Sequence, residues 1–197
     1  MHSRLRTASI VLALGITALC ATLAYRAYRT EAGIAQFEQR VASLAKAHPA
    51  PAADPARWSS LPAPVQRYFR FTFPDGAPVY TVARLSASGQ FRRPQTEGFN
   101  ATTARQVIAA GTPALMFSAT TPVVPGVWAR AYDFFANGQM EMKARILSAI
   151  TVVDEKETPE LNRISLRRWL LESALYPAAL LPGGPVTWEP VDGERAR

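Results

Sequence analysis

The chain has 197 residues and a formal net charge of +7, from 22 basic and 15 acidic side chains. Four of the basic residues and none of the acidic ones lie in residues 1–29, so the rest of the chain carries only +3. This near-balance, with no zinc-finger spacing and no aromatic-basic RNA motif, argues against a nucleic-acid partner.

The first feature along the chain is an uninterrupted run of small and apolar residues from Ala8 to Ala24. Arg4 and Arg6 precede the run, and Arg26 and Arg29 follow it. A helix of this length spans about 25 Å, close to the ~30 Å hydrocarbon core of a bilayer. We therefore predict a single-pass transmembrane anchor with basic flanks, and a membrane as the partner of Ala8–Ala24.

Two other interpretations of this segment stay open. A basic start, an apolar stretch and small residues near Ala21 are also typical of a cleaved secretory signal. Cys20 suggests a lipid-modified cysteine, although Leu19 stands where the bacterial lipoprotein signal has a small residue. The arginines are balanced across the run and leave the orientation open, but nearly all of the chain follows the run. We therefore expect an inner-membrane anchor in a bacterium, with the main domain outside the cytoplasm.

Apolar residues recur at spacings of three and four between Glu31 and Ala47, which predicts a helix with one apolar stripe. The stripe is too short to define a coiled coil, so the oligomeric state stays open; it consists of Ile34, Phe37, Val41 and Leu44. Prolines at positions 49, 51 and 55 then end the helix. We therefore divide the chain into an anchor at 1–29, a stalk helix and linker at 30–56, and a folded domain at 57–197.

The folded domain opens with a short helix expected over Leu61–Phe71, where prolines at 62 and 64 suit a first helical turn. From residue 79 the chain consists of short runs rich in Val, Thr, Phe and Tyr, separated by Gly and Pro, which predicts antiparallel strands. The expected strands are Val79–Gln90, Gly98–Val107, Ala114–Thr121, the two arms of a hairpin within Val127–Ile150, and Val186–Val191.

The hairpin is the clearest unit, because Asn137-Gly138 between two alternating runs is the strongest short-range signal of a type I′ turn. The turn fixes the register, so one apolar face pairs Phe135 with Met140, Asp133 with Met142, Ala131 with Ala144 and Ala129 with Ile146. The other face is aromatic and charged, and it places Trp128, Arg130, Tyr132 and Phe134 opposite Leu147, Arg145, Lys143 and Glu141.

A helix is expected over Glu160–Leu175, with one stripe of Leu161, Ile164, Leu171 and Leu175 and a second of Leu166, Trp169 and Leu170. A helix that is apolar on two sides needs contacts on two sides. We therefore predict an α+β fold in which a curved antiparallel sheet packs around this helix. Because the chain ends directly after the last expected strand, we expect part of the sheet to be missing at the C-terminus.

The folded domain contains no histidine and no cysteine, since the only such residues are His2, Cys20 and His48. Serine-histidine and cysteine-histidine nucleophiles, ordinary zinc sites and internal disulfides are therefore excluded within this domain. The sequence also has no GxGxxG and no Walker loop, so we expect no cofactor.

Three charged residues are the candidate site residues. The hairpin register places Asp133 on the apolar face, where desolvation raises a carboxyl pKa and suits the group to acid-base chemistry. Arg168 and Glu172 lie one helical turn apart beside an apolar stripe. A structural ion pair is the simpler interpretation of all three. We interpret a further acidic cluster as a turn that caps the following helix rather than a metal site; it consists of Asp154, Glu155, Glu157 and Glu160.

Three stretches resemble an uncharacterised, membrane-associated bacterial family known only as a domain of unknown function: the segment 61–69, the hairpin 132–138 and the stretch from Arg167 to Pro190. The resemblance covers roughly residues 60–197. Members of that family usually continue with further strands, so the chain resembles the N-terminal portion of the family. The resemblance implies an antiparallel β-rich α+β domain and no particular activity.

We therefore expect a membrane-anchored extracytoplasmic protein that binds an apolar or lipid-like ligand, because the domain combines apolar surfaces with a lack of catalytic motifs. One alternative is an acid-base enzyme that uses Asp133, Arg168 and Glu172. The other is a membrane assembly subunit that works through the apolar stripe of residues 31–47.

Overall fold

The computed structural model describes residues 2–75 and 77–197, without the side chains of residues 2–6 and Ala8, so the predicted flank of Arg4 and Arg6 lies outside the described side chains. The helices are α1 (His2–Ala47), α2 (Ala63–Thr72) and α3 (Pro159–Leu171), with short 3-10 helices η1 (Pro55–Trp58), η2 (Glu172–Leu175) and η3 (Pro177–Leu180). The strands are β1 (Val82–Phe91), β2 (Asn100–Ala109), β3 (Ala114–Val124), β4 (Val127–Ala136), β5 (Gln139–Ile146) and β6 (Ile150–Lys156).

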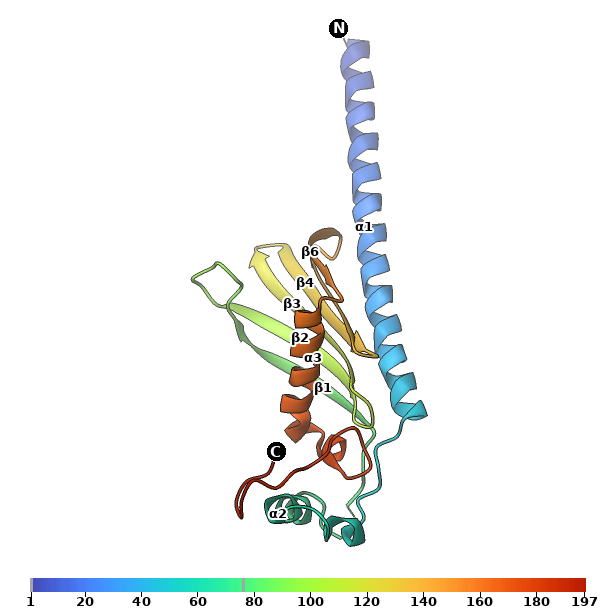
Figure 1. Cartoon of the computed structure of the whole chain (residues 1–197). Helices are drawn as coiled ribbons and strands as arrows, with labels where there is room; N and C mark the ends of the chain where they lie inside the picture. The colour runs from blue at the N-terminus through green and yellow to red at the C-terminus, as the bar shows by residue number, and fades with distance from the viewer. Residues whose placement is uncertain (1, 76) are drawn as a thin grey trace.

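The six strands form one antiparallel sheet in which each strand pairs with its neighbour in sequence, β1 through β6. Figure 1 shows α3 on one face of the sheet and α1 on the other, with α2 at the far end from the N-terminus. The predicted α+β class, with an N-terminal apolar helix followed by an antiparallel sheet and a helix, is confirmed.

The β4–β5 hairpin has the predicted register. Asn137 and Gly138 both have positive φ, 54° and 76°, as a type I′ turn requires. Asp133 pairs with Met142 and Phe135 with Met140, and the pairing continues to Ala129 and Ile146. A two-residue turn therefore determines which side chains face α3 and which face α1.

The α3 face holds the larger core. Trp169 of α3 is 2% exposed, and its indole Nε1 donates to the carbonyl of Ala109 at 2.9 Å. Phe69 of α2 and Phe135 of β4 are equally buried in the same cluster. The other side of α3 has no such cover among the described residues, because Ile164 is 61% and Leu171 82% exposed. The expected contacts on two sides of this helix are therefore made on one side only.

Helix α1 covers part of the opposite face. Ile34 and Val41 are fully buried there, and the Phe37 ring stacks on Phe134 with 4.2 Å between centroids. The stripe that the sequence assigns to a stalk thus packs against the chain's own sheet. An assembly interface through this stripe would first have to separate α1 from the sheet.

The N-terminal half of α1 projects past the sheet (Figure 1). Helix α1 has 46 residues, which is about 69 Å of helix. Its most apolar stretch, near the N-terminus, is not buried against the rest of the chain. By length and composition it is the one helix among the described residues that could cross a membrane.

Two predictions of local structure are wrong. Residues 150–156 form strand β6, so Asp154 and Glu155 lie in the sheet, where Asp154 Oδ1 is 3.6 Å from Lys143 Nζ, rather than in a capping turn. Helix α3 is instead capped by Thr158, whose side chain accepts from the backbone of Leu161.

Residues 186–191 form no strand; the described chain there makes an isolated bridge between Pro190 and Ala196. Short apolar runs of this kind are ambiguous because pairing depends on distant partners.

Candidate functional site

The three charged residues that the sequence singles out meet on the α3 face. Arg168 donates from Nη1 to Asp133 Oδ2 at 3.0 Å and from Nε to Glu172 Oε1 at 2.8 Å. Asp133 lies on β4, whereas Arg168 and Glu172 lie one turn apart at the end of α3. One guanidinium therefore joins the helix to the sheet through two carboxylates.

Neighbouring groups extend this network. Gln106 Nε2 donates to Glu172 Oε2 at 2.7 Å, and the Arg168 guanidinium lies 4.5 Å from the centroid of the Phe117 ring. Burial raises the pKa of the Asp133 carboxyl above its ordinary value, and the nearby Arg168 charge opposes that rise. Burial, with the negative charge of Glu172, also raises the pKa of the nearby Tyr176 hydroxyl. These groups largely satisfy one another's hydrogen-bonding capacity, as the polar groups of a structural cluster do.

The network brings two carboxylates to one arginine, and its described residues form no metal site. Asp133 and Glu172 are both partly buried and share one arginine, which places two carboxylates within reach of a common group. Among residues 2–75 and 77–197, no three His, Cys, Asp or Glu side chains are grouped closely enough to hold a metal ion. The acid-base role of these residues stays a prediction.

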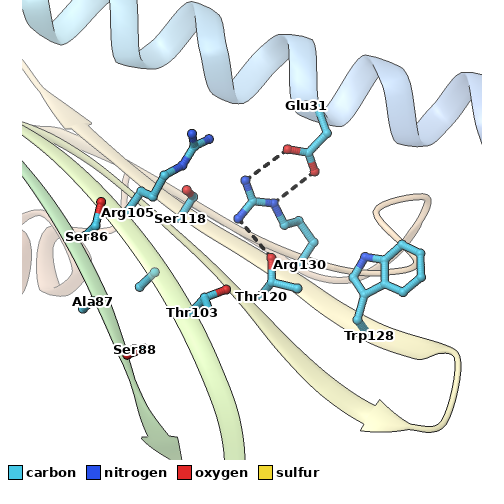
Figure 2. Close-up of a pocket in the computed structure, with 11 residues that line it drawn as sticks. Glu31, Ser86, Ala87, Ser88, Thr103, Arg105, Ser118, Thr120, Trp128 and Arg130 are labelled. Carbon is cyan, nitrogen blue, oxygen red and sulfur yellow. Dashed lines mark hydrogen bonds and ion pairs between the residues drawn. The ribbon is translucent and has the colours of Figure 1, made fainter.

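A second site lies on the opposite face. A cleft of about 580 Å³ is lined by residues of α1 and of strands β1–β4 (Figure 2). Its lining is rich in hydroxyl and guanidinium groups, with one carboxylate and one indole: Ser86, Ser88, Thr103, Ser118, Thr120, Arg105, Arg130, Glu31 and Trp128.

The antiparallel register assembles this lining from alternate residues of neighbouring strands. Ser88 pairs with Thr103, Thr103 with Thr120, and Thr120 with Arg130, so four strands contribute one polar row. A second row places Arg105 between Ser86 and Ser118. Because side chains alternate across a strand, both rows face α1.

Arg130 closes one side of the cleft. It is 8% exposed, and its Nε and Nη2 each donate at 3.0 Å to the two carboxylate oxygens of Glu31 on α1. Its third nitrogen, Nη1, lies 3.4 Å from Thr120 Oγ1, as the dashed lines of Figure 2 show. A bidentate pair of this kind fixes both orientation and distance, so it holds α1 at a set place on the sheet.

Ser118 has a different role. Its residue is 2% exposed, it lines the cleft, and its Oγ has no hydrogen-bond partner among the described residues. A buried hydroxyl without a partner costs about 1–3 kcal/mol. The Oγ is itself buried beneath the wall of the cleft, so a ligand would reach it only if neighbouring side chains moved.

A third, more apolar cleft of about 420 Å³ lies at the far end of the sheet, beside β1 and the turn that follows α3. Phe73, Tyr80, Leu85 and Leu175 are among its lining residues, and Tyr80 is 70% exposed. Neither this cleft nor the one beside α1 is lined by Asp133, Arg168 or Glu172.

Residues 59–197 match the family model described as Family of unknown function (DUF6920). The chain belongs to this family. The match covers most of the chain, lies in its C-terminal portion, and agrees with the extent expected from the motifs at 61–69, 132–138 and 167–190. No curated protein and no solved structure matches the chain.

The DUF6920 match begins after α1, whereas Glu31 of the cleft belongs to α1. Sequence reasoning did not find the cleft, because serines and threonines on strands are ordinary surface residues. The available signal is the spacing by two of polar residues on three strands: Ser86 and Ser88, Thr103 and Arg105, and Ser118 and Thr120. This spacing shows that the residues lie side by side only once the register of β1–β3 is known.

Proposed function

We propose that this DUF6920 protein is anchored by α1 in the inner membrane of a bacterium and that its extracytoplasmic domain binds an amphiphilic, lipid-like ligand. The observation that carries the proposal is the position of the polar cleft beside α1. Glu31, on the cleft wall, follows Ala24 at the end of the apolar run by seven residues, about 10 Å along the helix. The cleft thus opens close to the headgroup level of the membrane in which the helix would lie.

The chemistry of the cleft supports a polar headgroup as occupant. Ser86, Ser88 and Thr103 add hydroxyls near Ser118, and Arg105 adds an exposed guanidinium whose Nη2 lies 3.7 Å from Glu38 Oε1. Hydroxyl and guanidinium donors recognise phosphate, carboxylate and sugar oxygens. The apolar part of an amphiphile would lie along the exposed side chains of residues 9–24 of α1, within the bilayer.

The test is native mass spectrometry of the full chain, purified from bacterial membranes in a mild detergent. Thr103→Trp fills the cleft, and Thr151→Trp makes the same change at an exposed position on β6, outside the cleft. We expect a lipid-sized adduct on the unchanged chain and on Thr151→Trp, and its loss on Thr103→Trp. An equal adduct on all three proteins, or none on any, would contradict the proposal.

The acid-base enzyme is a second candidate, favoured by the convergence of Asp133, Arg168 and Glu172. It predicts that an amphiphile incubated with the unchanged chain is converted to a species of different mass, while Asp133→Asn leaves the mass unchanged. If both proteins leave every bound species intact, the network is structural.

A further inference from the structure

We propose that the end of the sheet nearest the anchor is a second membrane contact: the β1–β2 loop, the β3–β4 turn and the β5–β6 turn rest on the headgroup layer of an anionic bilayer. This inference rests on the part of the proposed function in which α1 spans the membrane. It does not depend on whether a ligand occupies the polar cleft.

Helix α1 is fixed to this end of the sheet by buried polar contacts. Thr30 is 3% exposed, and its Oγ1 donates to the carbonyl of Ser148 in the β5–β6 turn at 2.6 Å. Arg145 donates from Nη1 to the same hydroxyl oxygen at 2.6 Å. One residue further on, Glu31 holds Arg130 through two hydrogen bonds. The direction of the anchor therefore determines which part of the sheet faces the membrane.

The distance along the helix slightly exceeds the thickness of the headgroup layer. Thr30 follows Ala24 by six residues, about 9 Å of helix. A bilayer of about 40–45 Å with a core of ~30 Å leaves about 5–8 Å of headgroups on each side. The β5–β6 turn, which Thr30 contacts, therefore lies at the outer boundary of the headgroups when the apolar run fills the core.

The strand order places two more connections at the same end. In an antiparallel sheet with neighbouring strands in sequence order, every second connection lies at one end, here 92–99, 125–126 and 147–149. Figure 1 shows these three connections at the end of the sheet toward the projecting half of α1. They present a row of loops, rather than a single point, toward the membrane plane.

The side chains at this end suit a membrane interface. Large apolar or aromatic residues are exposed there: Phe91 (49%), Phe99 (66%), Val124 (56%), Trp128 (38%) and Ile150 (47%). The β1–β2 loop carries Arg92 and Arg93 against one acid, Glu97, while Arg26 and Arg29 lie on the adjacent turn of α1. The turns at the other end, residues 110–113 and 137–138, hold no aromatic and no basic residue. Aromatic side chains with arginines are the composition of membrane-interface belts, and the arginines attract anionic lipid.

The experiment uses the full chain in nanodiscs rich in phosphatidylglycerol. Cys20 is the only cysteine, so Cys20→Ser gives a background in which one new cysteine carries an environment-sensitive fluorophore. Phe99→Cys places the label at the proposed contact. Tyr80→Cys is the matched control, because Tyr80 is an equally exposed aromatic residue before the other end of β1.

We expect blue-shifted emission and quenching by lipid-attached nitroxides for the label at position 99. At position 80, which borders the apolar cleft at the far end of the sheet, we expect no quenching by the nitroxides. Arg92→Gln with Arg93→Gln, or high salt, should reduce the quenching at 99. Absence of nitroxide quenching at position 99 in protein-loaded nanodiscs would overturn the inference while leaving the anchor intact. Failure of the chain to enter nanodiscs would overturn the anchor and the contact together. Thr103→Trp should leave the signal at 99 unchanged; its loss there would show that the label reports the cleft instead.

Discussion

The two faces of the sheet are built differently. On the α3 face, aromatic side chains from α2, α3 and the sheet form a closed core, and the polar groups beside it bind one another. On the α1 face, the helix packs through a narrow apolar stripe and a few polar contacts from Thr30, Glu31 and Glu38, and a hydroxyl-lined cleft stays open beside it. The α3 face therefore supplies stability, and the α1 face retains polar groups beside an open cleft.

Trp169→Ala should cause the largest loss of stability, because it removes a fully buried indole and its hydrogen bond to Ala109 from the α3 face. We expect the free energy of unfolding to fall by about 3–5 kcal/mol. Thermal unfolding of the full chain in detergent, followed by circular dichroism, measures the change. Leu171→Ala, two residues away and 82% exposed, should stay within about 0.5 kcal/mol. Equal effects of the two changes would mean that α3 does not pack as described.

Gly111→Ala tests the close contact between Gly111 and the segment that leads from α1 toward α2. A Cβ at Gly111 would lie 2.2 Å from the carbonyl oxygen of His48 and 2.6 Å from the Pro49 backbone. Because backbone must move, we expect a loss of about 3 kcal/mol, at the upper end of the overpacking range. Gly89→Ala on β1 meets nothing within 4 Å and should cost little by comparison. If Gly111→Ala left the free energy of unfolding unchanged, residues 48–49 would not pack against the sheet.

Glu31→Gln weakens the ion pair of the α1 face. Arg130 is buried while Glu31 is half exposed, so we expect a loss of about 1–2 kcal/mol, below the full value for a buried charged pair. Hydrogen exchange should rise in residues 30–34 of α1. Glu38→Gln breaks the longer contact to Arg105, whose side chain is exposed. This change should alter neither the free energy of unfolding nor hydrogen exchange in residues 30–34. If exchange rises equally in both variants, Arg130 does not fix the helix.

Asp133→Asn should have the smallest effect, visible as a change with pH. The folded pKa of Asp133 is raised by burial, so the folded state keeps this proton at a pH where the unfolded state has released it. The contribution of Asp133 to stability is therefore present below its ordinary pKa of 3.8 and declines as pH rises through the folded pKa. The stability of the unchanged chain relative to Asp133→Asn should fall between pH 3 and pH 7 in chemical denaturation. A rise over that range would mean that Arg168 dominates over burial.

Local signals were sufficient for the β4–β5 hairpin. Asn137-Gly138 specifies its turn, and the period of two then specifies which residues face α3. The same reasoning placed Asp133 on the face that Arg168 reaches, although it could not show that the two side chains meet.

Features that depend on distant partners could not be predicted. Asp154 and Glu155 lie in a strand because β5 is their neighbour. The apolar stripe from Ile34 to Val41 resembles a stalk helix unless the sheet is known to lie beside it. The polar cleft needs the register of four strands and the position of Glu31 on α1 at once. No local pattern holds that information.

The most direct test of the claim that the cleft binds a ligand is Ser118→Ala, studied by thermal unfolding and by native mass spectrometry. In delipidated full-length protein, removing a buried hydroxyl without a partner should leave the midpoint of thermal unfolding unchanged or raised. In protein purified with its membrane lipid, the same change should lower the fraction that carries the adduct in native mass spectrometry. A lower unfolding midpoint with an unchanged adduct would contradict the account, because Ser118 would then serve the fold and not a ligand.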